Sequence, residues 1–96
     1  MDEPIQLPID GVLDLHTFKP AEVKDLVLEY LAECRARGIF QVRIIHGKGI
    51  GVQREMVRSI LARTPFVADW TDAPPTAGGL GATIVHLRTS DQGAAS

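Results

Sequence analysis

The sequence predicts an α/β (α+β) two-layer sandwich, in which two helices cover one face of a mixed four-stranded sheet. Three observations predict it: short runs of alternating apolar and polar residues, two longer segments with apolar residues at helical spacing, and the order β-α-β-α-β-β in which these segments occur. Each β-α-β crossover is expected to be right-handed. Two crossovers in the same direction stack both helices on one face of the sheet.

The first strand and the first helix are expected in residues 11–18 and 20–37. The run GVLDLHTF alternates in polarity, which puts Leu13 and Leu15 on one face of a strand. Pro20 suits the first turn of a helix. Six apolar residues then recur at helical spacing and predict the buried stripe of that helix. They are Val23, Leu26, Val27, Tyr30, Leu31 and Cys34.

The second strand and the second helix are expected in residues 41–46 and 52–63. The strand reads QVRIIH, and the helix reads VQREMVRSILAR with Pro65 just beyond its end. Four residues of this helix predict its buried stripe. They are Met56, Val57, Ile60 and Leu61.

The last two strands are expected in residues 66–72 and 82–88. The last strand, ATIVHLR, is too apolar for an edge of the sheet, whereas the third carries Asp69 and Asp72 and tolerates an edge position. The predicted strand order is therefore 1-2-4-3, with the fourth strand antiparallel to the others. The glycine-rich segment AGGLGAT before it is expected to be a flexible loop, with a tight turn into the fourth strand as the alternative.

Composition sets the broad class of the protein. The chain has 96 residues, 45% hydrophobic and 23% charged, which suits a single soluble domain over residues 11–88, with a leader at 1–10 and a mobile tail at 89–96. We find no run long enough for a membrane span and no signal-peptide core, so a monomeric, cytoplasmic protein is expected. The single cysteine excludes an intrachain disulfide. A net charge of −2 argues against bulk attraction to nucleic acid, so any phosphate contact must be local.

Three unusual sequences fall at one edge of the predicted sheet: DLHTF, HGKGIG and AGGLGAT. Ligands of open α/β sheets bind outside the carboxyl ends of the strands. In HGKGIG, the glycines let an anion approach the backbone amides, and the next helix begins there with unpaired N–H groups. Lys48 and Arg54 add positive charge. The alternative is an ordinary glycine-rich turn with a solvated lysine.

Titratable side chains accompany that loop. Asp14 and His16 are two residues apart on the predicted first strand, and His46 ends the neighbouring parallel strand. A histidine can take or give a proton near neutral pH, and a carboxylate can orient it or hold a metal ion. Two histidines and a carboxylate beside a phosphate-binding loop indicate a hydrolytic site. A solvated polar pair is the alternative for Asp14 and His16.

The motifs LDLH, HGKGIGVQRE and GGLGATIVHL, in this order and spacing, resemble the Smr (small MutS-related) domain over residues 11–88. The resemblance implies a stand-alone Smr protein, with a fold similar to the C-terminal domain of a bacterial translation initiation factor. Members of the family bind nucleic acid, and several cut it as DNA nickases or RNA endonucleases. The chain departs from the common pattern at Thr17, where many members have glycine, and at Gln53, where leucine is frequent.

The resemblance also implies roles for individual residues. Asp14 and His16 correspond to the motif implicated in cleavage, and His46 begins the loop implicated in binding or catalysis; we count all three as candidate catalytic residues. The candidate phosphate-binding residues come from that loop, from the helix after it and from the loop before the last strand. They are Gly47, Lys48, Gly49, Gly51, Arg54 and Gly79.

The predicted function is that of a nucleic-acid-binding domain that cleaves phosphodiester bonds in DNA or RNA. The alternative is a binding module without catalysis that docks on structured RNA, a ribosome or branched DNA. A divalent metal, Mg²⁺ or Mn²⁺, is a possible cofactor for the enzyme. The expected partners are DNA or RNA, with the ribosome or repair proteins as further candidates and no membrane.

Overall fold

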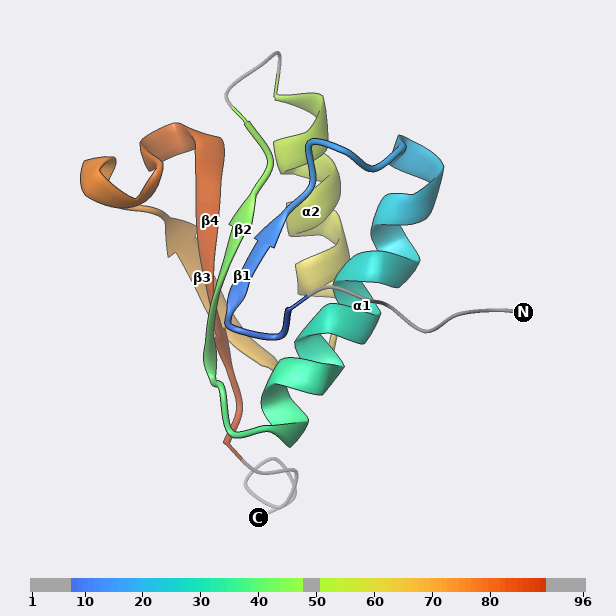
Figure 1. The fold of residues 1–96 in the computed structure, drawn as a ribbon, viewed down its shortest axis with the longest axis vertical. Helices are drawn as coiled ribbons and strands as arrows, with labels where there is room; N and C mark the ends of the chain where they lie inside the picture. The colour runs from blue at the N-terminus through green and yellow to red at the C-terminus, as the bar shows by residue number, and fades with distance from the viewer. Residues whose placement is uncertain (1–7, 48–50, 90–96) are drawn as a thin grey trace.

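The computed structural model describes residues 8–47 and 51–89. In these residues, four strands and two α-helices follow one another in the predicted order (Figure 1). They are β1 (Val12–Asp14), α1 (Pro20–Ala36), β2 (Gln41–Ile45), α2 (Val52–Ala62), β3 (Val67–Asp72) and β4 (Ala82–Leu87), with the short 3₁₀ helices η1 (Pro75–Ala77) and η2 (Gly79–Gly81) before β4. Lys48 and Gly49 of the predicted loop, residues 1–7 of the predicted leader and residues 90–96 of the predicted tail lie outside the described residues.

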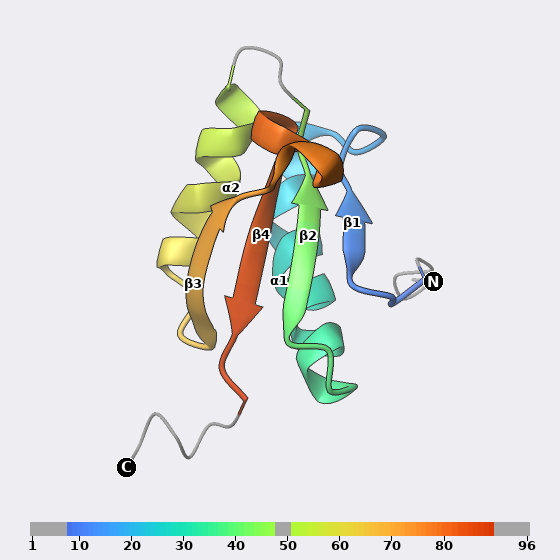
Figure 2. The same ribbon diagram turned by 90° about the vertical axis from the view of Figure 1, so that its left-hand side faces the viewer.

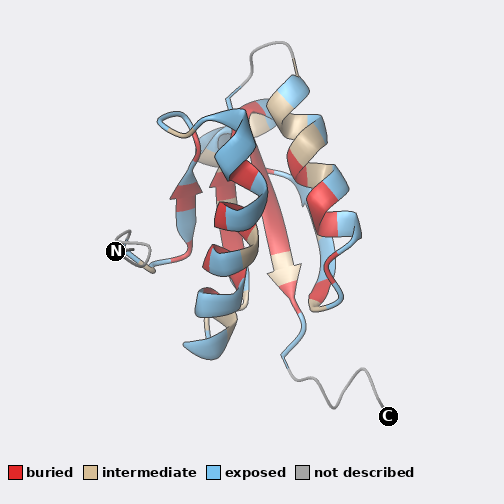
Figure 3. Ribbon diagram, turned by 90° about the vertical axis from the view of Figure 1, so that its right-hand side faces the viewer, coloured by how far each residue is buried: buried red, intermediate tan, exposed pale blue. Residues whose placement is uncertain are grey.

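The strands form one mixed sheet in the order β1-β2-β4-β3, which confirms the predicted order. β1 runs parallel to β2, whereas β4 is antiparallel to both β2 and β3. Both α-helices lie on the same face of this sheet (Figure 1, Figure 3), so the predicted two-layer sandwich is confirmed. β3, with its charged side chains, forms one edge of the sheet as predicted.

α1 begins at Pro20, the residue whose fixed φ angle favours a first helical turn. The side chain of Glu22 reaches back and accepts a hydrogen bond from the backbone N–H of Lys19 at 2.9 Å, which satisfies a donor that the helix leaves unpaired. All six residues of its predicted stripe are buried. Among the residues that the structure describes, no helix has the length and apolar character needed to cross a membrane.

The core lies between the helices and the sheet, and the helices and strands on both sides of it carry the buried residues (Figure 3). Three of the four predicted residues of α2 are buried, and Met56 is half-buried at the margin of the core. Cys34 is fully buried, as a packing residue of α1. The largest fully buried side chains are Tyr30, Leu13, Leu15, Leu31, Ile44 and Leu61.

The opposite face of the sheet has no α-helix over it in the described part of the chain (Figure 2). In β2, Val42 and Ile44 are buried under the helices, so by strand alternation Arg43 projects from the open face. η1 and η2 fold across one end of this open face (Figure 2), and the guanidinium of Arg43 donates a hydrogen bond to the carbonyl of Ala77 at 3.0 Å. The segment predicted to be a flexible loop therefore has defined 3₁₀ structure.

The first strand is shorter than the predicted segment 11–18, because β1 ends at Asp14 and a turn follows. The Asp14 carboxylate accepts a hydrogen bond from the backbone N–H of His16 at 3.0 Å. An aspartate that bonds the backbone two residues on favours a turn over a continued strand. Asp14 and His16 are thus joined by a turn and do not share one face of a strand.

Candidate functional site

The carboxyl ends of the parallel strands β1 and β2 lie side by side, and the start of β4 meets them. The N–H of Leu15 donates to the carbonyl of Ile45 at 2.9 Å. The N–H groups of His46 and Gly47 both donate to the carbonyl of Gly81, at 3.0 and 2.8 Å. The three unusual sequences therefore meet, as predicted. We call this end of the sheet the loop edge; it comprises residues 14–17, 46–47, 51–54 and 78–82.

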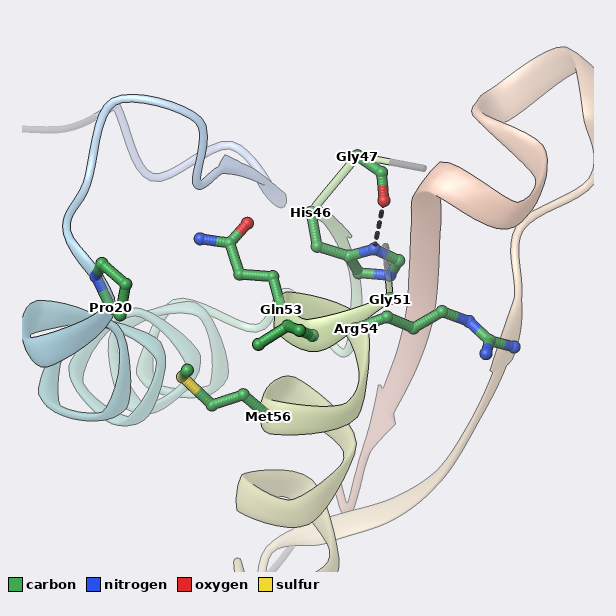
Figure 4. Close-up of a pocket in the computed structure, with 8 residues that line it drawn as sticks. Pro20, His46, Gly47, Gly51, Gln53, Arg54 and Met56 are labelled. Carbon is green, nitrogen blue, oxygen red and sulfur yellow. Dashed lines mark hydrogen bonds between the residues drawn. The ribbon is translucent and has the colours of Figure 1, made fainter. Parts of the chain in front are cut away.

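A pocket of about 290 Å³ opens at the loop edge, between the start of α1 and the start of α2 (Figure 4). It is lined by Pro20, His46, Gly47, Met56 and residues 51–54. The backbone φ angles of Gly47 and Gly51 are +84° and +83°, which residues with a Cβ rarely adopt. The first N–H groups of an α-helix have no partner within it. A glycine-rich turn next to such a helix start is a usual setting for a bound anion.

His46 is held in place by both nitrogens of its ring. Nδ1 lies 3.1 Å from the carbonyl oxygen of Gly47 (Figure 4), and Nε2 lies 2.8 Å from the hydroxyl of Thr83. A carbonyl can only accept, so Nδ1 carries the proton and Nε2 accepts the hydrogen bond of Thr83. The residue is only 8% exposed. Burial lowers the pKa of His46, and the nearby positive charges of Arg54 and Arg58 lower it further, against the hydrogen bond to Gly47 that raises it.

Asp14 and His16 form an exposed acid–base pair. Nδ1 of His16 lies 2.9 Å from the same carboxylate oxygen of Asp14 that accepts its backbone N–H. The side chains are 75% exposed for His16 and 46% for Asp14. The backbone hydrogen bond of His16 lowers the pKa of Asp14, and the hydrogen bond of its ring lowers it further. Asp14 therefore stays ionised and orients an imidazole that solvent and ligands can reach.

The two histidines lie at the same edge of the sheet but on opposite sides of it. The neighbours of Asp14 in the chain are buried under the helices, so its side chain points to the open face, where the ring of His16 joins it. His46 follows Ile44 in the buried series of β2, and its ring reaches Thr83 within the protein. The sequence predicts one hydrolytic site for both histidines; in the structure His46 lines the pocket, and His16 does not.

Arg54 lines the pocket, but its guanidinium points away from Gln53 and toward β3 (Figure 4). There one NH₂ group donates to the carboxylate of Asp72 at 2.9 Å. Arg58, one helical turn further along α2, donates to the same oxygen at 2.5 Å. The hydrogen bond from Arg54 is the main cause that lowers the pKa of Asp72, and the charges of both arginines add to it.

Gly79 is the predicted phosphate-binding residue on the third segment of the loop edge. It begins η2 with a φ angle of +55°, and its N–H donates to the carbonyl of Pro74 at 3.0 Å. Its own amide is thus engaged within the 3₁₀ turns. Gly78 has a stronger steric reason to be glycine, because a Cβ there would lie 2.9 Å from the Cβ of Ala82.

Metal ligands are few at this site. In residues 8–47 and 51–89, no group of three or more His, Cys, Asp or Glu side chains is arranged to hold a metal ion. Asp14 offers one exposed carboxylate, already bonded to His16 through one of its oxygens. Mg²⁺ often binds one or two carboxylates and completes its shell with water and substrate phosphates. A substrate-dependent divalent ion at Asp14 is compatible with this donor set.

Four polar groups of the loop edge and its surroundings escaped prediction. Thr83 and the carbonyl of Gly81 hold His46 and Gly47, and Arg58 and Asp72 pair between α2 and β3. For Thr83, the local signal in the sequence is a threonine beside the apolar residues Ile84 and Val85 of the last strand. At the far end of the sheet, His86 lies apart from the site, and its ring is hydrogen-bonded to Asp69 at 2.6 Å.

Comparisons with known proteins agree with these observations. The model of the Smr domain family matches residues 13–88. Endonuclease MutS2 of Thermus thermophilus is 42% identical over 76 residues, which is 79% of this chain and 10% of that protein. Endonuclease MutS2 of Helicobacter pylori is 37% identical over 75 residues, 78% of this chain and 10% of that protein. The chain thus spans about a tenth of the length of these curated relatives.

Two crystal structures are similar over most of the chain. The Smr domain of Thermus thermophilus MutS2 has a TM-score of 0.77 and 41% identity, and the match covers 81% of this chain and 98% of that one. YdaL, a stand-alone small MutS-related protein from Escherichia coli, has a TM-score of 0.72 and 32% identity, and the match covers 84% of this chain and 66% of that one.

Proposed function

Because the chain belongs to the Smr domain family, we propose that it binds the phosphate backbone of nucleic acid at the loop edge and that Asp14 and His16 cleave a phosphodiester bond there. The observation that carries the proposal is the juxtaposition at one edge of an exposed Asp–His pair and a pocket at the start of α2. The related MutS2 proteins are named endonucleases, which supports a nuclease-related role.

Phosphate binding depends on a few local groups, since the net charge of the chain is −2. The N–H groups of residues 51–54 are in the first turn of α2, where a helix attracts anions. Lys48, which precedes that turn in the sequence, and Arg54 within it supply full positive charges. Contacts of this kind fix the position of a nucleic-acid strand but do not read its sequence.

In our proposal, His46 is a positioning residue that holds the backbone at the start of the loop. Its ring ties the end of β2 to β4 through Thr83, and its Nδ1–H binds the carbonyl of Gly47 at the start of the loop. A catalytic role for His46, as a proton donor, would require it to give up one of these two hydrogen bonds. A positioning role requires no such change.

In our proposal, cleavage of RNA uses the exposed Asp14–His16 pair. With the His16 proton on Nδ1, in the bond to Asp14, Nε2 keeps a lone pair that faces solvent. Nε2 accepts the proton of the 2′-hydroxyl, whose oxygen forms a bond to the adjacent phosphorus. The bond from phosphorus to the 5′ oxygen then breaks, and water protonates that oxygen. Positive groups at the loop edge stabilise the negative charge that develops on the phosphate.

DNA lacks the 2′-hydroxyl, so its cleavage requires water as the nucleophile. His16 can accept a proton from that water as it does from the hydroxyl. A divalent ion bound at Asp14 would lower the pKa of a coordinated water and so make it a better nucleophile. We retain both substrates in the proposal for this reason.

The test is a cleavage assay on end-labelled single-stranded RNA and on supercoiled plasmid, with and without a chelator. His16→Ala should lose about 10²–10⁴-fold in rate, the usual effect of removing an acid–base group, and should still bind the probe. His86→Ala is the matched control, because His86 also pairs with an aspartate but lies at the far end of the sheet.

Equal rates for His16→Ala and the wild type would refute the proposed catalytic role. If the wild type binds both probes but cuts neither, with or without added Mg²⁺ or Mn²⁺, the alternative function stands: a binding module for structured nucleic acid or the ribosome. The high exposure of the Asp14–His16 pair is compatible with such a contact role.

A further inference from the structure

Two arginines of α2 share one carboxylate oxygen in this structure. Arg54 and Arg58 each donate an NH₂ group to Oδ1 of Asp72, at 2.9 and 2.5 Å. Their side chains are largely covered, with 28% and 23% exposed. The Nε atom of each is buried and has no hydrogen-bond partner in the described part of the chain. Both guanidiniums are therefore ordered by the fold but incompletely satisfied.

The Arg54–Arg58 pair has more positive charge and more hydrogen-bond donors than Asp72 and Glu55 can neutralise and accept. Each guanidinium offers five N–H donors, and Asp72 provides one negative charge to two cations. Glu55 approaches Arg54 only to 3.8 Å and is 75% exposed, so it adds little. Two adjacent guanidiniums with unused donors are suited to a phosphate group, whose several oxygens can accept from both.

The pair is close to the proposed phosphate-binding loop. Arg54 lines the pocket at the start of α2, and its side chain extends from there to β3 (Figure 4). The charges of Arg54 and Arg58 both act on the buried ring of His46. An anion at the pair would thus lie beside the pocket at the start of α2.

We propose that Arg54 and Arg58 form a second position for a backbone phosphate of the bound nucleic acid, which Asp72 occupies in the free protein. Arg58 is then a binding residue, and Asp72 is an internal competitor of the ligand. The inference rests on the proposed function, because it takes the nucleic acid to be bound at the loop edge. It adds a second contact and a residue that limits affinity.

A phosphate can displace the Asp72 carboxylate from the two arginines. Asp72 is the last residue of the edge strand β3, and its side chain is 42% exposed, so the carboxylate can turn into water. Ion pairs this close to solvent are weak and screened by salt. A phosphodiester carries the same charge as the carboxylate it replaces. It presents two non-bridging oxygens, one for each arginine, whereas both arginines share a single oxygen of Asp72 in the free protein.

The experiment measures binding of fluorescently labelled single-stranded RNA and DNA by anisotropy, over a series of salt concentrations. Asp72→Asn should tighten binding about threefold to tenfold, because the competitor loses its charge. Asp69→Asn is the matched control: it removes the same charge from the same strand, but Asp69 pairs with His86. Its effect should be smaller.

Arg58→Gln should weaken binding about tenfold and reduce the slope of log affinity against log salt by about one, as expected when one phosphate contact is lost. Arg63→Gln removes an equal charge from the other end of α2 and should do neither. Thermal unfolding of each variant checks that it is folded. If Asp72→Asn does not fold, Asp72→Ser and the two arginine variants decide the question.

The proposal is overturned if Asp72→Asn matches Asp69→Asn and Arg58→Gln matches Arg63→Gln, while Lys48→Ala still weakens binding. In that case the loop binds phosphate and the second position does not exist. If the wild type binds neither probe at low salt, the proposed function fails, and the second position fails with it.

Discussion

At the scale of single residues, His46 is the most constrained polar side chain of the loop edge, because both ring nitrogens are bonded within the protein. Only the neutral ring can donate from Nδ1 and accept at Nε2 at once. Protonation would put a hydrogen on Nε2, which could then no longer accept the hydrogen bond from Thr83. It would also place a positive charge near Arg54 and Arg58. The folded protein therefore resists protonation of this residue.

This resistance predicts a pH dependence of stability. The ordinary pKa of His46 is 6.5, and the fold lowers it. Below about pH 6.5 the unfolded chain binds a proton that the folded chain does not, so the free energy of unfolding should fall as the pH drops from 6.5 toward the lowered pKa. One proton gives a slope of at most about 1.4 kcal/mol per pH unit. Urea denaturation between pH 8 and pH 5 measures it.

In the variant His46→Gln this part of the slope should disappear. Asp14 and Asp72 also have lowered pKa values, but their ordinary value is 3.8, so they reduce stability only at more acidic pH. Equal slopes for the wild type and His46→Gln above pH 5 would contradict the hydrogen-bonding pattern assigned to the ring.

Residue types and spacing were sufficient to bring Asp14, His16 and His46 to one edge, because each follows a predicted parallel strand. The side of the sheet on which each lies was harder to predict, since it depends on where β1 stops. Asp72 and Arg58 were missed for another reason. They are 14 residues apart and pair only because α2 packs beside β3, which no local pattern encodes.

At the scale of elements, the segment before β4 is built around one glycine. Gly78 has a φ angle of +114°, and a Cβ there would lie 2.9 Å from the Cβ of Ala82. Gly38 also has a positive φ, +80°, but a Cβ there would meet nothing within 4 Å. An alanine at Gly38 would therefore cause backbone strain alone, whereas an alanine at Gly78 would cause backbone strain and steric overlap.

Gly38→Ala should cost about 1–2 kcal/mol, the penalty of a left-handed conformation. Gly78→Ala should cost about 1–3 kcal/mol more, because the turn must also move away from Ala82. The free energies of unfolding from chemical denaturation test this difference. Equal costs for the two variants would show that the turn is not tightly packed against β4.

The helices could be predicted closely, because α1 and α2 combine start signals, regular apolar spacing and a clear end. Every predicted stripe residue of α1 is buried. The irregular elements could not be predicted as well. β1 ends early because the Asp14 carboxylate accepts a hydrogen bond from the backbone of His16. Residues 75–81 form 3₁₀ turns, and the hydrogen bond from Arg43 to Ala77 ties these turns to the open face of the sheet.

At the scale of the whole molecule, the topology determines where function can reside. Two parallel strands and two crossovers bring the ends of β1 and β2 to one edge, and the antiparallel β4 starts at that edge. This arrangement could be predicted from the polarity of the last two strands. It places the acid–base pair on the open side of the sheet and the pocket on the helix side. A nucleic-acid strand that crosses the loop edge would therefore contact both.

The central claim is that nucleic acid binds at the loop edge, and nuclear magnetic resonance of the ¹⁵N-labelled protein tests it most directly. On titration with a short oligouridine RNA, and with its DNA counterpart, we expect the backbone signals of residues 14–17 and 46–54 to shift most. The Nε signals of Arg54 and Arg58 should shift with them. Shifts centred on Gln41, His86 and Arg88 at the far end of the sheet, or no shifts at low salt, would contradict the account.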